Sequence, residues 1–508
     1  MASTADTKLD SVHEEHKGSI DGGKIEMPND QIKHGDRALA LIGSEQIELT
    51  EEDSRRICRK TDRVILAILV WVYFLQILDK SVLGYGATYG LKTDTHLTGN
   101  EYSLVGSIAP IAQLAWQPFS SYLIVKVPHR ILMPALCLGW AGCLPLFSII
   151  TSQWYRRAEQ PIRVAAWYGT NGAATIIAAA LSYGLGHIKS DLLKEWQIIF
   201  LFVGLVTIVS SPFIYWKLDN DIPSARFLTE QEKAQAIERL RANQTGTGSR
   251  EFKWKHLLEA AVEPKTYLWI AMALLLNVGA SVTNTFGPLI LNGLTIVILL
   301  ASFLAQKARV KGVILMLFMI PVVAGLAVLY SVPRDNSAKA ALLVGYYLLA
   351  FLFGGNPLIV TWIVGNTAGT TKKSSIMSVY NAASSAGNII GPLLFNDKDA
   401  PAYKPGLRAC LAIFVALVAV VAIQWANLIV LNKLQEKKRV RNGKKAKVVD
   451  HSMDSTYQTM DERTTVEEAV IAQENAAGTV EFGGEARLGE QAFLDLTDRQ
   501  NDEFVYIY

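Results

Sequence analysis

Two adjacent charged residues, Asp79 and Lys80, stand inside a long apolar stretch, Val64–Gly86. A helix needs ~20 such residues to cross ~30 Å of hydrocarbon, so the stretch is long enough to span a bilayer. Charges there cost roughly 2.5–3.5 kcal/mol each and usually face a protein interior or a wet cavity. In a cavity, the carboxyl group could exchange protons and the ammonium could meet an anion. Alternatively, both lie near the outer interface, where Lys80 reaches water.

Uncharged polar side chains occur within other apolar stretches and could hydrogen-bond a polar ligand. Those of most interest are Gln113, Asn171, Asn284, Asn381 and Asn388. Asn381 and Asn388 are seven residues apart and therefore share one helix face. The alternative role of such residues is hydrogen bonding between helices, worth about 0.6 kcal/mol each. Their number favours a polar pathway through a helical bundle, and hence transport.

The sequence carries no pattern that would indicate an enzyme. It has no HExxH, GxSxG or Walker motif, and its glycines lie in apolar stretches rather than before a phosphate-binding loop. The four cysteines show no disulfide or metal spacing, and the formal charge of +3 implies no nucleic-acid patch. We therefore expect no catalytic residues, cofactor, metal or nucleic acid, and a membrane enzyme is the least favoured class.

The elements that position these residues are apolar blocks. Half of the 508 residues are hydrophobic, 19% are charged, and the mean hydropathy is +0.23. Besides the first stretch, the candidate spans are Glu101–Val125, Ile131–Thr151, Val164–Ile188, Trp196–Trp216, Tyr267–Leu291, Val313–Val332, Ala340–Val364, Ser375–Phe395 and Leu407–Asn432, with a shorter run at Leu294–Gln306. The ten-residue alternation of a membrane β-barrel is missing, so the fold class is all-α: a polytopic transmembrane helical bundle.

Polar stretches divide the chain into five parts. We expect a disordered cytosolic tail at 1–60, an N-terminal transmembrane domain at 61–216, a cytosolic linker at 217–265, a C-terminal transmembrane domain at 266–432, and a basic, then disordered, cytosolic tail at 433–508. Basic clusters flank the first and last spans, which places both tails in the cytosol by the positive-inside rule. Low hydrophobicity is typical of disordered tails.

Two helix starts have capping signals. Asp62 precedes the first apolar run and could cap its helix. In the linker, Thr229 and Glu232 have the spacing of a capping box and precede an amphipathic pattern. The linker pattern predicts a helix that lies on the cytosolic membrane surface.

The positive-inside rule fails at two places. Ile131–Thr151 is one span long, yet basic residues flank both of its ends, so both ends belong in the cytosol. Tyr267–Gln306 is too long for one span and short for two, and Asn292-Gly293 is its turn signal. A tight hairpin with a stunted second helix is the direct solution for this second stretch.

Several strings are specific to one family in combination. FLQILDKSVLGYG, PLFSIITSQWYRRAEQPIRVAAWYGTNG, ARFLTEQEKAQAIERLRANQTG, TNTFGPLIL and DLTDRQNDEFVYIY resemble fungal allantoate permease-like transporters, in the anion:cation symporter family of the major facilitator superfamily. The resemblance covers nearly all of residues 60–435 and the last residues of the sequence. It implies two six-helix domains, cytosolic termini, a monomer in the plasma membrane, and proton-coupled uptake of a small organic anion or vitamin such as allantoate, ureidosuccinate, nicotinate or pantothenate.

The chain departs from this family pattern twice. The family has about one more span's worth of residues between segments like RILMPALCLGW and AGCLPLF, which here meet at Trp140 and Ala141. A second gap follows PLILNG, between Gly293 and Thr295. Both gaps fall where the charge rule fails, so parts of helices 3/4 and 7/8 are expected to be missing, which leaves about ten full spans. Exon skipping or a faulty gene model would explain this.

The resemblance and the residue types together give two readings of function. In the first, the chain is a proton-coupled symporter whose substrate and proton pathway is formed by Asp79, Lys80, Gln113, Asn171, Asn284, Asn381 and Asn388. In the second, the gaps have left a transport-defective paralogue or a non-transporting membrane sensor. If the chain is expressed as written, weak or absent transport is expected, because a helix that lines the cavity in the family is lost.

Overall fold

The computed structural model describes residues 47–97, 101–139, 143–286, 291–333, 337–395, 399, 402–448, 450–454, 456–457 and 491–508. These residues form helices joined by turns and contain no strand. Six of the helices described are long and apolar enough to cross a membrane: Glu51–Thr88, Gln160–Leu185, Glu195–Lys217, Lys311–Ser331, Lys339–Gly365 and Lys404–Arg441. The expected all-α, polytopic helical fold is confirmed.

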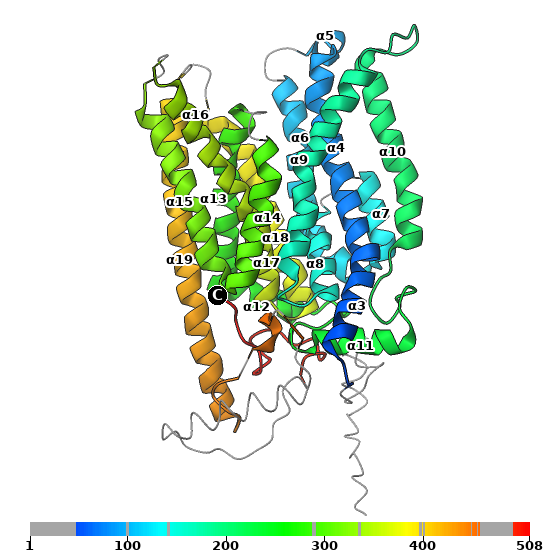
Figure 1. The fold of residues 1–508 in the computed structure, drawn as a ribbon, viewed down its shortest axis with the longest axis vertical. Coiled ribbons are helices and arrows are strands. Elements are labelled where there is room, and N and C mark those ends of the chain that lie inside the picture. Colours follow the sequence, from blue (N-terminus) through cyan, green and yellow to red (C-terminus); the bar gives the residue numbers. More distant parts are fainter. Residues whose placement is uncertain are drawn as a thin grey trace, which may run out of the picture.

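The helices form two groups that lie side by side (Figure 1). The N-half contains α4 (Ala67–Thr88), α6 (Glu101–Lys126), α7 (His129–Gly139), α8 (Leu144–Trp154), α9 (Gln160–Leu185) and α10 (Glu195–Lys217). The C-half contains α13 (Pro264–Phe286), α14 (Leu291–Ala308), α15 (Lys311–Ser331), α16 (Lys339–Leu348), α17 (Gly355–Gly365), α18 (Thr370–Ile390) and α19 (Lys404–Arg441). The halves meet where α6 packs along α18 and α9 packs along α14.

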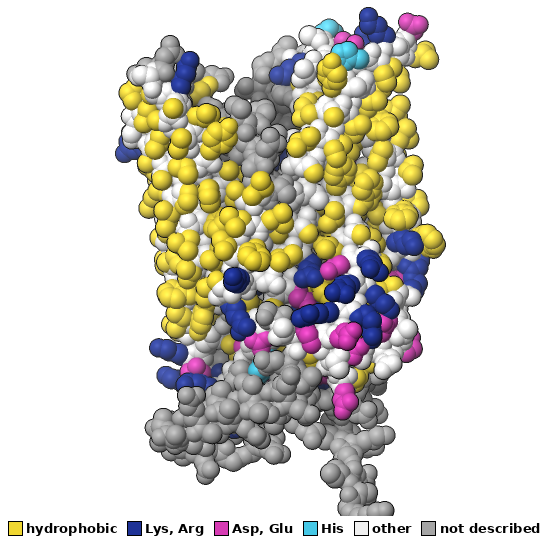
Figure 2. All heavy atoms as spheres, viewed as in Figure 1, with side chains coloured by type: hydrophobic (Ala, Val, Ile, Leu, Met, Phe, Trp, Pro, Cys, Tyr) yellow, Lys and Arg dark blue, Asp and Glu magenta, His cyan; other side chains and the backbone are white. Residues whose placement is uncertain are grey.

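One end of the bundle is strongly charged. Lysine, arginine, aspartate and glutamate side chains gather at the lower end in Figure 2, below a broad apolar belt. We call this the charged end. It carries α3 (Glu51–Thr61), α11 (Glu230–Arg241), α12 (Trp254–Val262) and the segment 491–508 (Figure 1).

The candidate span Ile131–Thr151 is two helices rather than one. Helices α7 and α8 have 11 residues each, so each is about 16 Å long, roughly half of a membrane span. Both lie toward the charged end (Figure 1). The expectation of one span is therefore wrong here, and two half-length helices that both lie toward the charged end satisfy the basic residues at both ends of this stretch.

The second difficult stretch forms two helices of unequal length. Helix α13 has 23 residues and α14 has 18. The stunted second helix is as expected, but the turn is not, because Asn292 and Gly293 lie inside α14. Residues 287–290, between the two helices, lie outside the described part.

The first long helix starts earlier than predicted. Helix α3 runs through a π-helical turn, Asp62–Leu66, into α4 as one continuous helix of 38 residues. The cap is Thr50, whose hydroxyl accepts a hydrogen bond from the Asp53 amide at 3.2 Å. The prediction that Asp62 caps the helix is wrong. Its carboxylate instead lies 2.9 Å from the guanidinium of Arg163 on α9.

The linker helix α11 has the predicted capping box. Thr229 and Glu232 each accept a hydrogen bond from the other's amide, at 3.3 and 3.1 Å. The helix is not simply a surface helix, however, since Glu238 and Arg239 are fully buried. Arg239 pairs with Glu159 at the start of α9. The linker therefore forms part of the packed charged end.

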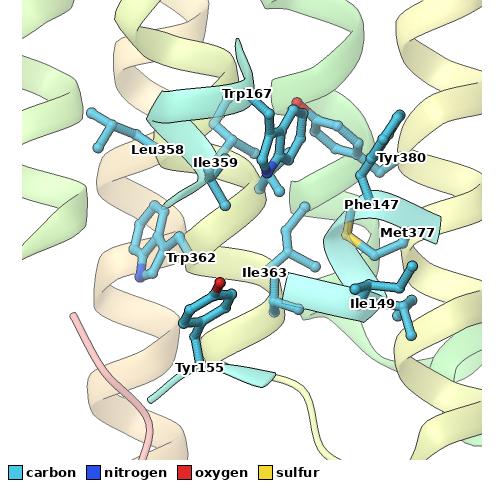
Figure 3. Packing of buried hydrophobic residues seen from close by; sticks show 14 of the residues in the cluster. Phe147, Ile149, Tyr155, Trp167, Leu358, Ile359, Trp362, Ile363, Met377 and Tyr380 are labelled. Carbon is cyan, nitrogen blue, oxygen red and sulfur yellow. The ribbon is translucent and has the colours of Figure 1, made fainter. Parts of the chain in front are cut away.

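The halves share a dense hydrophobic core next to the charged end (Figure 3). Phe147 of α8 stacks on Trp167 of α9, with ring centroids 5.4 Å apart. Met377 and Tyr380 of α18 pack near them, and Trp362 of α17 lies on the other side of the same core (Figure 3). All five side chains are buried. This core fills the space between the halves on the side of the charged end.

The tail contains ordered segments where disorder was expected. Helix α19 continues to Arg441, and residues 450–454 and 491–508 pack against the charged end. Asp498, Asn501 and Phe504 are buried. For these segments the expectation of a disordered tail is wrong, because their polar groups find partners under the bundle. Residues 458–490 lie outside the described part.

Candidate functional site

Asp79 lies deep in the N-half. It precedes the end of α4 at Thr88 by nine residues, or about 13 Å along the helix axis. Its side chain is half-buried, and the hydroxyl of Thr207 on α10 donates a hydrogen bond to Oδ2 of Asp79 at 3.2 Å. This depth favours an interior position over the outer interface.

Lys80 lies on a different face of α4. It follows Tyr73 by seven residues, so the two side chains share a helix face two turns apart. The ring of Tyr73 packs against Trp167 and Tyr168 of α9, at centroid distances of 5.3 and 5.4 Å. Lys80 itself is exposed. The face of α4 that turns toward α9 therefore carries an accessible ammonium group, whereas Asp79 turns toward α10.

Gln76 lies between these two residues and was missed by the sequence reasoning. It is three residues after Tyr73 and four before Lys80, which places it on the same face. Its Oε1 is buried, and no donor in the described part of the chain reaches it. Buried polar atoms are usually hydrogen-bonded, so this oxygen is a candidate acceptor for a ligand. The spacing to Lys80 is the signal that could have found it.

Asn171 belongs to the same neighbourhood. Its side chain on α9 is half-buried and lies within hydrogen-bonding reach of Tyr73 on α4. The Tyr73 hydroxyl also lies near those of Tyr168 and Tyr380. Since Tyr380 belongs to α18, this group of tyrosines joins the two halves. No periodic pattern in the sequence predicts this group, because its members come from three distant helices.

Asn381 and Asn388 share one face of α18, as their spacing predicts. Their amides each donate to a carbonyl of their own helix, Asn381 to Met377 at 2.9 Å and Asn388 to Ser384 at 3.0 Å. Asn381 is buried and Asn388 half-buried. Bonding within one helix leaves the amide oxygens to other partners, and it differs from the interhelical bonding considered as the alternative.

The two remaining predicted residues, Gln113 and Asn284, lie on α6 and α13. Gln113 is half-buried on α6, one turn from Gln117, near the contact with α18. There, the hydroxyls of Ser120 and Ser378 lie 2.8 Å apart across the two halves. Asn284 belongs to α13, but its side chain lies outside the described part. The predicted residues thus separate into groups on α4 and α9, on α6, and on α18.

A second polar cluster lies at the charged end, and the sequence did not predict it. The ammonium of Lys372 on α18 lies 2.8, 2.6 and 2.9 Å from carboxylates of Glu259, Glu263 and Asp498. Lys265 at the start of α13 also pairs with Asp498. Burial alone would raise the pKa of Asp498, but the two ammonium groups outweigh it and hold the pKa well below its usual range.

In the part of the chain that the structure describes, neither region forms a metal site. Among the described residues, no group of three or more His, Cys, Asp or Glu side chains could hold a metal ion. The four cysteines are buried and unpaired. Polar groups from several helices around an exposed lysine are instead suited to hold a small polar or anionic molecule.

Sequence comparison gives the family of this chain. The Major Facilitator Superfamily matches residues 137–392. The MFS-type transporter cnsL of Penicillium expansum is 32% identical over 79% of this chain and 85% of that protein. The chain belongs to the Major Facilitator Superfamily. Members of this superfamily are transporters of small molecules rather than enzymes, so the chain is a multi-pass membrane transporter protein.

Other members of the superfamily resemble this chain in fold or in sequence. The structure of the proton:xylose symporter XylE matches with a TM-score of 0.51 at 12% identity, over 71% of this chain and 95% of that one. Allantoate permease of Saccharomyces cerevisiae is 27% identical over 82% of this chain and 86% of the permease. That alignment is 479 positions long although it uses 82% of a 508-residue chain. It therefore crosses several dozen positions at which this chain has no residue.

Proposed function

We propose that this major facilitator protein is a proton-coupled symporter for a small organic anion or vitamin, in the allantoate permease-like, anion:cation symporter branch. The observation that carries the proposal is Lys80, an accessible ammonium group inside a membrane-spanning helix. Ionisable groups in such positions mark substrate or ion pathways. The family-specific strings and the 27% identity to allantoate permease support an anion as the substrate class.

The proposed roles follow from the two faces of α4. Lys80 is the counter-ion for the substrate anion, and Gln76 and Asn171 accept or donate hydrogen bonds beside it. Asp79 carries the coupled proton: its carboxyl group is half-buried inside a membrane-spanning helix and accepts a hydrogen bond from the hydroxyl of Thr207. Gln113, Asn284, Asn381 and Asn388 would complete the pathway from α6 and the C-half.

The proposed topology places the charged end in the cytosol. Basic residues of α3, α11 and α19 gather there, as the positive-inside rule requires of a cytosolic surface. Both tails would then be cytosolic, with domains at 61–216 and 266–432 joined by the linker 217–265. We propose the plasma membrane as the location and a monomer as the working unit.

A specific observation supports a second candidate, a transport-defective form. Helices α7 and α8 are two half-length helices of the N-half, where the family has two complete ones. The gap in the alignment with allantoate permease is consistent with missing segments. Exon skipping or a faulty gene model would produce such a chain. A non-transporting sensor would tolerate the loss of these segments.

Uptake of a substrate panel tests both candidates. Cells would express the 508-residue chain or a form with relatives' segments restored between Trp140 and Ala141 and between Gly293 and Thr295. Radiolabelled allantoate, ureidosuccinate, nicotinate and pantothenate would be offered at pH 5 and pH 7. We expect acid-stimulated uptake of one anion by the restored form and much weaker uptake by the shorter chain. The matched control is Lys80→Gln in the restored form.

The outcomes separate the two candidates. Uptake by neither form at either pH would contradict the symporter proposal, and equal uptake by both would contradict the transport defect. Sequencing the mature transcript adds an independent result. A continuous reading frame that joins Trp140 to Ala141 would defeat the gene-model explanation.

A further inference from the structure

The segment 491–508 lies against the charged end in an extended path beneath both halves (Figure 1). Its polar side chains Thr497, Asp498 and Asn501 are almost completely buried, as is Phe504. Polar groups are buried at this level only when partners satisfy them. We call this segment the strap.

The C-half holds the strap through the strap's own backbone. The side-chain amide of Asn366 donates to the Ile507 carbonyl at 2.9 Å and accepts from the Ile507 amide at 2.7 Å. Asn432 makes the same reciprocal pair with Tyr506, with both distances at 2.8 Å. The indole of Trp362 also donates to the Ile507 carbonyl. Such two-point contacts to consecutive residues form a built docking site for an extended peptide.

Charge fixes the register of the strap on the C-half. The Asp498 carboxylate pairs with Lys265 and Lys372, and it also accepts a hydrogen bond from the Tyr506 hydroxyl at 2.8 Å. All four side chains are buried. Removing one member of a buried ion pair leaves an uncompensated charge, which is strongly unfavourable. Asp498 is therefore the main anchor.

The N-half contacts the same strap. Arg157, between α8 and α9, donates to the Val505 carbonyl at 3.2 Å, and its guanidinium lies 4.6 Å from the centroid of the Phe504 ring. The linker adds a hydrogen bond from Asn501 to Gln244 at 2.9 Å. Arg157 is also buried. The strap therefore joins the two halves at the charged end.

A major facilitator protein works by rocking one half against the other around a central site. If the charged end opens, Arg157 and the Lys265–Lys372 pair must separate, and the strap cannot keep both sets of contacts. We propose that residues 491–508 are a releasable strap, docked in a site built by both halves, that holds the charged end of the transporter closed. Calling this end cytosolic rests on the proposed function, but the closure itself does not.

The test measures the distance between the halves rather than uptake. Spin labels would be placed at Lys217→Cys on α10 and Lys307→Cys on α14, two exposed positions, in the full chain in lipid nanodiscs. The native cysteines are buried, which favours labelling at the introduced sites. We expect one short distance in the full chain. Deleting 491–508 should add a longer one, with the open population raised about tenfold.

Three comparisons make the outcome decisive. Adding a synthetic peptide of residues 491–508 to the deleted chain should restore the short distance, and a scrambled peptide should not. Arg157→Gln frees the strap from the N-half only and should also raise the open population. Arg499→Gln is the matched control, because this strap side chain is 58% exposed and its ion pair with Glu263, at 3.8 Å, is long and open to solvent, so it should leave the distances unchanged.

Two results would overturn the proposal. The first is an unchanged distance distribution after deletion and in Arg157→Gln. The second is an open population in the deleted chain that the peptide does not reduce. Because no substrate is present, these results do not depend on whether the chain transports an anion. A closed, strap-dependent state without any uptake would contradict the proposed function alone.

Discussion

The α4 residues and the cluster at the charged end both place ionisable groups inside a helical bundle, but in opposite ways. Lys80 is exposed, and Asp79 accepts a hydrogen bond from a neutral hydroxyl. Lys372 is fully buried and has three carboxylates within 3 Å. A charge that is already matched by protein partners stabilises one conformation. An accessible charge is available to a ligand.

The two regions also differ in how they join the halves. Apart from Tyr73, which lies near Tyr380 of α18, the residues of α4 contact α9 and α10, which belong to the same half. The cluster instead includes Asp498 of the strap, which reaches Arg157 of the N-half through Val505 and Phe504. We infer that ligand chemistry and conformational control are separated along the membrane normal. Three predictions test this separation, beginning with the largest effect.

Substituting Asp79 should abolish acid-stimulated uptake by the restored form. Asp79→Asn keeps the shape of the side chain and its contact with Thr207 but removes the proton that the carboxyl group can carry. We expect uptake at pH 5 to fall to the rate of cells without the transporter. The measurement is initial uptake between pH 5 and pH 7. Unchanged acid stimulation would remove Asp79 from the mechanism.

A matched control comes from the same half. Asp94 accepts a hydrogen bond from the indole of Trp196 at 3.0 Å near the end of α10 that lies away from the charged end. Asp94→Asn makes the same chemical change outside the proposed pathway. Its uptake profile should match that of the unsubstituted transporter.

The sequence predicted the apolar helices well because length and hydropathy determine which segments can cross a bilayer. It also marked both irregular stretches, since basic residues at both ends of Ile131–Thr151 could not be satisfied by one span, although it did not predict two half-length helices there. It misplaced the turn at Asn292-Gly293. That dipeptide is a strong turn signal in hairpins, but here the helix α14 contains it.

The contacts of the strap could not be predicted in the same way. Asp498 lies 126 residues beyond Lys372 in the chain, and its polar surroundings resemble those of a disordered tail. Only the fold shows that the buried Lys265 and Lys372 pair with it. The pathway residues were found in part, because Asp79 and Lys80 break an apolar run visibly. Gln76 was missed because an uncharged side chain interrupts such a run less clearly.

Removing a cation from the cluster should destabilise the protein. In Lys372→Met, the carboxylates of Glu263 and Asp498 remain buried with one fewer partner, which typically costs about 3–5 kcal/mol. The measurement is denaturant unfolding in detergent. The control is Arg55→Met, since Arg55 is 61% exposed and pairs with Glu51 within one helix, so about 0–0.5 kcal/mol is expected. Equal losses in both variants would contradict a structural role for the cluster.

The smallest expected effect is that of pH on the strap. Lys265 and Lys372 hold the pKa of Asp498 well below its usual range despite burial, so Asp498 stays ionised at pH ~3.9, where an unfolded carboxyl group would be half-protonated. A carboxyl group whose pKa is depressed contributes stability above the unfolded pKa, and this is lost only as pH falls through the depressed value. Asp498 should therefore keep its ion pairs with Lys265 and Lys372, and the strap its main anchor, between pH 8 and pH 5.

The spin-label distance between α10 and α14 provides the measurement, at pH 8, 6.5 and 5, alongside uptake at the same values. We expect the closed population to remain constant while uptake rises toward acid pH. An open population that grows at pH 5 in the full chain, and is absent in Asp79→Asn, would mean that the α4 carboxyl group drives opening across the whole bundle. In that case the two regions form one coupled system, and release of the strap depends on the protonation of Asp79.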